Sequence, residues 1–453
     1  MLYSTNSFAE CGREVGLLIM RMYPKAKVSE KAERALKGGH PWVYAEEVLS
    51  VDGDYTNGGL VDVYTKKDRF IGTGFINDNS KIRIRIFSRN ANDRFDDDFF
   101  RRRIRYALEY RQTVMGNDFD CCRIIFGEAD SFPGLTVDRF GDVLVFQILS
   151  LGTEMLKSRL FPLFIEVFKE FGINIRAVCE RNDVAIREKE GLTQHKGFIS
   201  CDLLPPAPDS GLVMIEENGI KYEIDVINGQ KTGFFLDQKY NRRAAAKIAA
   251  GKTVLDCFTH TGAFALNAAA ACAKHVTAVD ISADAIQKTR RNAELNGLSG
   301  RMDFVCADVF DLLTDMESNR KHGYDYIILD PPAFTKSRDT IGSAVKGYKA
   351  INAKAMKLLP RGGYLATCSC SHFMTDELFR KMLHNAAEDA GVQLRQIEAR
   401  QQAPDHPILW NVPETDYLKF YIFQIVYLFV SDKYPKASVQ FRCFRMLLFF
   451  VRF

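Results

Sequence analysis

Hydrophobic and polar positions near the start of the chain alternate in short runs, which predicts a small β domain. Glycine-rich turn signals divide the stretch over 27–89, and the runs LVDVYT, FIGTGFI and KIRIRIF stand between them. In the last run Lys81, Arg83 and Arg85 fall on one face and isoleucines on the other, which is the period of a half-buried strand. This basic face is typical either of contact with RNA phosphates or of a charged edge strand.

The next stretch, over 91–205, mixes helical and strand periods. Apolar residues recur at helical spacing over 94–115, and a strand at VLVFQIL, a helix over 154–171 and a strand near 177–181 follow. A proline-rich stretch over 203–211 then marks a boundary. We therefore expect an α+β module between the β domain and the rest of the chain.

Strands and helices alternate after Gly219. The predicted strands are IKYEIDV, KTVLDCF, HVTAVD, MDFVCAD, YDYIILD and GGYLATCSCS, with a terminal buried strand over 417–430. Such alternation predicts an α/β domain with a doubly wound, mostly parallel sheet, which binds ligands at the carboxyl ends of its strands.

The chain is thus predicted to contain three domains, over 23–90, 91–205 and 206–427. Residues 1–22 are expected to form a disordered extension, and 428–453 an atypical tail. The first residues lack a signal peptide, and the apolar stretch over 417–430 is too short to cross a bilayer, so we expect a cytoplasmic protein without a membrane partner.

Composition narrows the class of protein. Of the 453 residues 47% are hydrophobic and 26% are charged, which excludes a disordered chain. The net charge of +4 is too small to indicate a polyanion partner, so any nucleic-acid binding must use local basic patches. The 11 cysteines include no CxxC pair and no zinc spacing, which predicts reduced thiols and no metal site.

Acidic residues stand where three successive strands of the predicted parallel sheet end, with KTVLDCF counted as the first strand. They are Asp256, Asp280 and Asp308. A carboxylate at the second strand suits the two hydroxyls of a ribose, and one at the third suits an adenine amino group. A single acid there is typical of a helix cap, but three at consecutive strand ends indicate a nucleoside cofactor. The candidate cofactor contacts are Asp256, Phe258, Thr259, Gly262, Asp280, Asp308 and Asp330.

The fourth strand ends in IILDPPAF, where two prolines fix a rigid turn that holds Asp330 and Phe334. Asp330 can bond a base edge while Phe334 packs or stacks, although a plain proline turn fits equally. The fifth strand ends in TCSCS, which supplies Cys368 and Cys370. Residues two apart share a face of a strand, so spacing alone does not choose between the two thiols.

The order of these motifs resembles the class I S-adenosylmethionine-dependent methyltransferases, and the stretch over 23–425 resembles the RlmI-type large-subunit rRNA methyltransferases. The matching stretches are GGHPWVY, GEADSFPGLTVDRFGD, NGQKTGFFLDQKYNRR, VLDCFTHTGAFAL, LDPPAF and TCSCS. The resemblance implies an N-terminal PUA RNA-binding domain, a central α+β module and a seven-stranded methyltransferase sheet. It also implies S-adenosylmethionine as the cofactor and methylation of carbon 5 of a cytosine in large-subunit rRNA.

That reaction needs a thiolate, because carbon 5 of cytosine is a poor nucleophile until a thiolate has added at carbon 6. By resemblance to the TCS motif of RNA cytosine-5 methyltransferases, the nucleophile is Cys370 and Cys368 is structural. The catalytic candidates are Cys370 and Asp330. The fourth-strand motif lacks the second cysteine of many such enzymes, so another base, or a water near Asp330, must remove the carbon 5 proton.

Two other functions stay open from the sequence. LDPPAF also resembles the signature of amino-methylating enzymes, which favours N-methylation of guanine or adenine in RNA as the alternative activity. A non-catalytic RNA-binding or ribosome-assembly factor is the other, and a homodimer is left open. The family resemblance favours a lid role for NGQKTGFFLDQKYNRR, over a flipped base, rather than a plain hairpin with a packed Phe pair. The predicted RNA contacts are Lys231, Phe234, Phe235, Gln238, Arg242, Phe334, Arg83 and Arg85.

Overall fold

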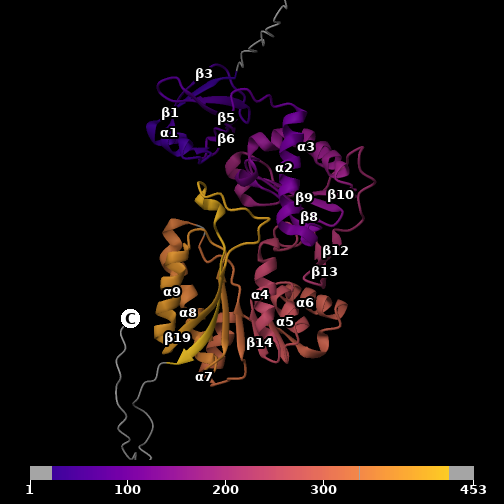
Figure 1. Cartoon of the computed structure of the whole chain (residues 1–453), viewed down its shortest axis with the longest axis vertical. Coiled ribbons are helices and arrows are strands. Elements are labelled where there is room, and N and C mark those ends of the chain that lie inside the picture. The colour runs from indigo at the N-terminus through magenta and orange to yellow at the C-terminus, as the bar shows by residue number, and fades with distance from the viewer. Residues whose placement is uncertain (1–22, 336, 428–453) are drawn as a thin grey trace, which may run out of the picture.

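The computed structural model describes residues 23–335 and 337–427, which form a β domain, a central α+β module and an α/β domain along the long axis of the molecule (Figure 1). The predicted extension over 1–22 and the tail over 428–453 lie outside these residues. Within the described part of the chain, no helix is long and apolar enough to cross a membrane.

The N-terminal β domain is a six-stranded sheet with the order β2-β6-β5-β4-β1-β3. Its elements are β1 (Lys25–Val28), α1 (Glu30–Lys37), β2 (Trp42–Val43), β3 (Val48–Asp52), β4 (Leu60–Tyr64), β5 (Phe70–Ile76) and β6 (Ile84–Ser88). Strand β6 starts three residues later than KIRIRIF predicts, because the backbone amide of Asn77 bonds the carbonyl of Arg83 and closes a turn (2.7 Å). Ile84 and Ile86 face the core, as the alternation predicts.

The central module is a five-stranded sheet with the order β11-β10-β9-β8-β7, and the long helices α2 and α3 lie side by side against it (Figure 1). Helix α2 starts at Asp97 because the side chain of Asp96 accepts a hydrogen bond from the amide of Phe99 and caps it. The elements are α2 (Asp97–Met115), β7 (Cys121–Phe126), β8 (Leu135–Phe140), β9 (Val143–Ile148), α3 (Leu151–Glu170), β10 (Ala177–Asn182) and β11 (His195–Phe198).

A hairpin of β12 (Leu212–Glu217) and β13 (Ile220–Asp225) joins the module to the α/β domain. The segment IKYEIDV is therefore a strand, but it lies outside the doubly wound sheet in which we expect it. Its buried and exposed residues alternate, whereas a strand covered on both faces is apolar throughout. The buried side chains of the hairpin pack into one core with the central module and with the first helices of the α/β domain.

The α/β domain has a seven-stranded sheet with the order β16-β15-β14-β17-β18-β20-β19. Strands β14 to β18 are parallel, and β20 runs antiparallel between β18 and β19. The strands are β14 (Thr253–Cys257), β15 (His275–Asp280), β16 (Met302–Cys306), β17 (Tyr326–Leu329), β18 (Tyr364–Ser369), β19 (Val392–Arg400) and β20 (Lys419–Tyr427). The predicted doubly wound, mostly parallel sheet is confirmed.

Helices cover both faces of this sheet (Figure 1). One core contains residues of α4 (Lys239–Ala249), α5 (Ala263–Ala270) and α6 (Ala283–Leu295). The other contains residues of α7 (Val309–Ser318), α8 (Ile341–Leu358) and α9 (Asp376–Ala390).

The segment over 401–418, here named the β19–β20 loop, rises from the sheet towards the other two domains (yellow in Figure 1). Nε2 of His40 in the β domain lies 3.2 Å from Oε2 of Glu414, and Nη2 of Arg111 on α2 donates to the carbonyl of Asp405 (3.0 Å). The loop therefore connects all three domains at the end of the sheet where the parallel strands finish.

Candidate active site

The predicted strand-end residues gather at one edge of the α/β sheet. Strand order reverses between the neighbouring strands β14 and β17, and the crevice of a doubly wound sheet opens at such a point. Asp280 is the last residue of β15, Asp330 follows β17 and Cys370 follows β18. The tertiary structure thus places Asp280, Asp330 and Cys370 at the same edge of the sheet.

The turn after β14 is wound tightly around the buried carboxylate of Asp256. Its Oδ2 accepts hydrogen bonds from the hydroxyl of Thr259 (2.6 Å) and from the amide of Ala265 (2.9 Å). Burial raises the pKa of Asp256 to about 7. The backbone angle φ is positive at Phe258, at His260 and at Gly262. Asp256 therefore stabilises the turn from inside, and its contact with the cofactor stays a prediction.

The two other acids, Asp280 and Asp308, are partly exposed near the ends of β15 and β16. Oδ2 of Asp280 accepts from the amide of His260 and Oδ1 from the amide of Ser282, each at 2.9 Å, so this carboxylate fixes the turn from outside. Asp308 caps α7 by accepting from the amides of Phe310 and Asp311. Asp308 is thus a helix cap, which is the alternative role that the sequence left open for it.

Asp330 lies at the centre of a small polar cluster. Its Oδ1 accepts a hydrogen bond from Nε2 of Gln238 (3.1 Å) and another from the thiol of Cys368 (2.8 Å). Burial raises the pKa of Asp330 and takes the pKa of Cys368 well above its ordinary value. Cys368 is therefore a buried, protonated partner of Asp330.

Cys370 has different surroundings from Cys368. Its side chain is partly exposed, and burial raises the pKa of its thiol while the nearby cation of Lys231 opposes that rise. The ammonium of Lys231 lies 4.4 Å from the centre of the Phe235 ring, which meets the His260 ring edge-on at 5.0 Å. Lys231 and Phe235 thus stand at the open side of the cluster, next to the thiol.

The comparisons with known proteins agree with this geometry. Residues 26–89 match the model of a PUA-like domain, and residues 190–423 match that of an S-adenosylmethionine-dependent methyltransferase. "Ribosomal RNA large subunit methyltransferase I" of Pseudoalteromonas atlantica is 39% identical over 87% of this chain and 97% of the relative. The Klebsiella pneumoniae protein of the same name is 37% identical over 88% and 97%.

The chain belongs to the RlmI-type large-subunit rRNA methyltransferases.

This methyltransferase uses S-adenosylmethionine and acts on large-subunit rRNA, as the resemblance implies. A Streptococcus mutans protein described as a methyltransferase shares the fold, with a TM-score of 0.73 and 24% identity over 88% of this chain and 99% of that one. A second solved structure, a methyltransferase complexed with S-adenosylhomocysteine, has a TM-score of 0.74 at the same identity and the same two shares. Family membership favours an enzyme over the assembly-factor alternative.

Two of the predicted RNA contacts in the methyltransferase domain are wrong. The guanidinium of Arg242 is buried and forms an ion pair with Glu217, with N–O distances of 2.7 and 2.9 Å. The ring of Phe234 is buried against Tyr222, 5.0 Å between centres. Both side chains belong to the core beneath the motif. Gln238 is also buried, but it lies within the site because it bonds Asp330.

The other predicted contacts have partners within the protein as well. Arg85 pairs with Glu128 (3.3 Å) and Glu190 (2.9 Å) of the central module and is 12% exposed, so it joins two domains and the prediction of an RNA contact is wrong. Arg83 pairs with Asp78 in its own domain (2.9 Å). Phe334 packs against Tyr348, 4.5 Å between ring centres, which is the packing alternative for this residue.

The sequence gave no individual role to two further groups at the site, although Asp237 lies within the predicted lid motif. Asp237 lies in the short 3-10 helix η5 (Leu236–Gln238), and its Oδ2 accepts a hydrogen bond from the hydroxyl of Tyr417 (2.6 Å). The ammonium of Lys419 donates to the carbonyls of Ser371 (2.6 Å) and Tyr417 (2.8 Å), and burial lowers its pKa to about 8. A lysine inside an apolar strand was the available signal for Lys419.

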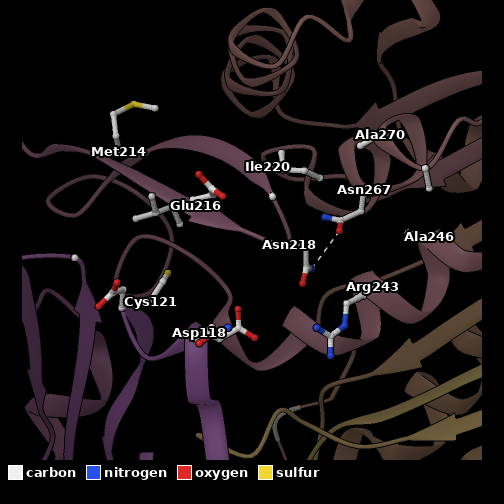
Figure 2. Close-up of a pocket in the computed structure, with 16 residues that line it drawn as sticks. Asp118, Cys121, Met214, Glu216, Asn218, Ile220, Arg243, Ala246, Asn267 and Ala270 are labelled. Atoms are coloured by element: carbon white, nitrogen blue, oxygen red, sulfur yellow. Dashed lines mark hydrogen bonds between the residues drawn. The ribbon is translucent and has the colours of Figure 1, made fainter. Parts of the chain in front are cut away.

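A separate cavity of about 860 Å³ lies between the central module and the methyltransferase domain (Figure 2). Asp118, Glu216 and Arg243 face it together with Met214, and Asn218 donates to Oδ1 of Asn267 at its wall (3.1 Å). None of its lining residues belongs to the cluster around Asp330. The cavity therefore lies apart from the site of methyl transfer.

Proposed function

We propose that this enzyme methylates carbon 5 of a cytosine in large-subunit rRNA through a covalent adduct with Cys370. The observation that carries the proposal is the position of Cys370, which is partly exposed directly after β18. Burial raises the pKa of its thiol, and the charge of Lys231 opposes part of that rise. A thiolate is the nucleophile that this chemistry requires, and a nearby cation favours the thiolate.

The two thiols have different roles in this proposal. The thiol of Cys368 is buried and donates to Asp330, which is the arrangement of a structural group. Cys370 is more exposed and has no hydrogen bond to Asp330 among those that the described residues make. We therefore assign the nucleophile to Cys370, and Asp330 to the edge of the target base.

The reaction balances with these groups. The sulfur of Cys370 bonds to carbon 6, and the electron pair of the carbon 5–carbon 6 double bond becomes available at carbon 5. Carbon 5 takes up the methyl group that S-adenosylmethionine would supply from its sulfonium, and S-adenosylhomocysteine would leave. A base then removes the carbon 5 proton, the bond between sulfur and carbon 6 breaks, and the double bond and the thiolate are restored.

The turn after β14 fits the cofactor of the family. The hydroxyl of Thr261 is buried without a hydrogen-bond partner among the described residues, and the positive φ angles nearby turn the backbone sharply at the start of α5. We propose that Phe258, Thr259 and Gly262 shape this wall and that Asp280 holds the ribose hydroxyls. For Asp308 we keep contact with the adenine as a proposal beside its role as a cap.

Lys231 and Phe235 remain as proposed RNA contacts, because the ammonium is about half exposed and the ring lies beside it. A cation over an aromatic ring suits a phosphate and a stacked base. The homodimer and the cytoplasmic location stay predictions from the sequence.

The test is a covalent trap. RNA in which 5-fluorocytosine replaces the target cytosine should form an adduct with the wild-type enzyme that survives denaturation, because fluorine at carbon 5 blocks the elimination. Cys370→Ala should abolish both the adduct and methyl transfer, whereas Cys368→Ala should retain the adduct. Mass spectrometry of nucleosides from rRNA of cells with and without the gene identifies the methylated atom.

Full activity of Cys370→Ala would contradict the thiolate mechanism. A methyl group on an exocyclic nitrogen in the same rRNA would favour the N-methylation that the LDPPAF motif also predicts. The nucleoside analysis does not depend on the yield of any variant, because it uses the native enzyme.

A further inference from the structure

Asp237 has one carboxylate oxygen without a partner inside the candidate active site. The residue is 3% exposed, and its Oδ2 accepts from Tyr417 and lies 3.8 Å from the ammonium of Lys231. Its Oδ1 is buried and has no hydrogen-bond partner among the described residues. An unsatisfied buried acceptor is costly, so this atom indicates a donor that the protein itself does not supply.

The carboxylate of Asp237 is held in a fixed place next to the reacting groups. The β19–β20 loop supports it twice, through the Tyr417 hydroxyl and through the amide of Ala403, which donates to the carbonyl of Asp237 (2.8 Å). The next residue, Gln238, donates to Asp330, and the charge of Asp237 acts on both Asp330 and Cys370. The free oxygen is thus part of the same cluster as the proposed nucleophile.

Asp237 is an acceptor of hydrogen bonds and not a base. Burial by itself raises the pKa of this carboxyl, but the charges of Lys231 and His406 and the hydrogen bond from Tyr417 bring the pKa below its usual range. An ionised carboxylate with a low pKa removes a carbon-bound proton poorly. It binds an N–H donor strongly, because charge-assisted hydrogen bonds are the strong ones.

We propose that the free oxygen of Asp237 accepts a hydrogen bond from the exocyclic amino group of the target cytosine and so selects cytosine over uracil. The inference rests on the proposed carbon 5 reaction, in which the flipped base lies between Cys370 and Asp330. Uracil has a carbonyl oxygen in place of the amino group, and its lone pairs would face the carboxylate. A site built for a donor rejects the analogue that lacks it.

The experiment compares target bases in one RNA fragment that spans the mapped nucleotide. The three bases are cytosine, uracil and pyrimidin-2-one, which is cytosine without its amino group. In the wild-type enzyme, cytosine should be preferred to both. Asp237→Asn keeps the shape of the side chain and can still accept from Tyr417, but it lacks the charge. Its kcat/KM for cytosine should fall about 10- to 100-fold.

The variant should change specificity as well as rate. Because pyrimidin-2-one has the same intrinsic reactivity for both enzymes, the ratio of its kcat/KM to that of cytosine isolates the contact. This ratio should be higher in Asp237→Asn than in the wild type, and the relative rate with uracil should rise, since an Asn amide can donate to the uracil carbonyl. Glu216→Gln, an exposed acid in the separate cavity, is the matched control and should leave all three rates unchanged.

Three results would overturn the inference. One is an unchanged preference for cytosine in Asp237→Asn, and another is an equal loss on all three bases together with weaker S-adenosylmethionine binding by calorimetry. Asp237→Ser replaces the Asn variant if that variant does not fold. The third result is an unchanged preference for cytosine in Asp237→Ser. Failure of the proposed function is a separate finding, because the wild-type enzyme would then leave carbon 5 of cytosine unmethylated.

Discussion

Cys368 and Cys370 stand two residues apart at the end of one strand, yet their surroundings differ. The thiol of Cys368 donates to Asp330 and is buried, whereas Cys370 is partly exposed near Lys231. The sequence places both on one face of the strand and names Cys370 only by family resemblance. The contrast in burial is an independent physical argument for the same assignment.

Asp256 gives a prediction at the residue scale, because its pKa of about 7 lies above the ordinary value of 3.8. An acid whose folded-state pKa is raised binds more protons in the folded state between these two pH values, so its contribution to stability falls as the pH rises from about 4 to 7. Asp256→Asn removes the ionisable group, and with it this loss of stability at higher pH. We expect its melting temperature to exceed that of the wild type by a few degrees near pH 8.

The difference between the two melting temperatures should shrink as the pH falls from 8 to 4. Differential scanning calorimetry across this range checks it. A variant that melts well below the wild type at pH 8 would show that the ionised carboxylate stabilises the turn.

At the scale of elements, the turn between β14 and α5 depends on one glycine. Gly262 has φ of +85°, and a Cβ atom there would lie 2.5 Å from Cγ2 of Thr289 on α6. An L-residue at positive φ is strained by about 1–2 kcal/mol, and the close contact with α6 adds to this. The glycine therefore fixes both the turn and the spacing between α5 and α6.

Gly262→Ala should lower the affinity for S-adenosylmethionine by about tenfold, because about 1.4 kcal/mol corresponds to that factor. Isothermal titration calorimetry measures it. Gly300→Ala is the matched control, since a Cβ atom at Gly300 meets nothing within 4 Å and its φ is not in the left-handed region. Equal affinities in the two variants would contradict the role of the turn.

Two elements also show the limits of periodicity. The segment IKYEIDV has a clean strand period, but the period does not say which sheet the strand joins. Strand β19 was not predicted, because it lies at the edge of the sheet, where polar residues interrupt its apolar ones and only Val392 is fully buried. Its partner β20 is apolar and was predicted as the terminal strand.

At the scale of the whole molecule, ion pairs join the domains. Arg85 reaches Glu128 and Glu190 from the β domain, while the β19–β20 loop bonds His40 and Arg111. Arg85, which the sequence assigned to RNA, therefore holds the PUA-like β domain on the central module. The small net charge of +4 gave no indication of this use.

Arg85→Ala should loosen the β domain, because it leaves two largely buried carboxylates without their cation, a loss of about 3 kcal/mol. We expect faster limited proteolysis between β6 and α2 and a lower melting temperature. Arg83→Ala is the control on the same face, since its surface pair with Asp78 is worth at most about 1 kcal/mol. A fall in RNA affinity with unchanged stability in Arg85→Ala would restore the original prediction.

The sequence by itself determined the α/β fold and most of its strands, because burial on a sheet or a helix repeats with a short period along the chain. It also determined the strand ends where Asp280, Asp330 and Cys370 lie, since parallel strands finish at one edge. Only the tertiary structure decided which polar groups are free. Arg242 forms an ion pair with Glu217, and Arg85 with Glu190. The partners are far apart in the sequence, so no local sequence pattern predicts these pairs. The free oxygen of Asp237 likewise depends on Tyr417, which reaches it from the β19–β20 loop.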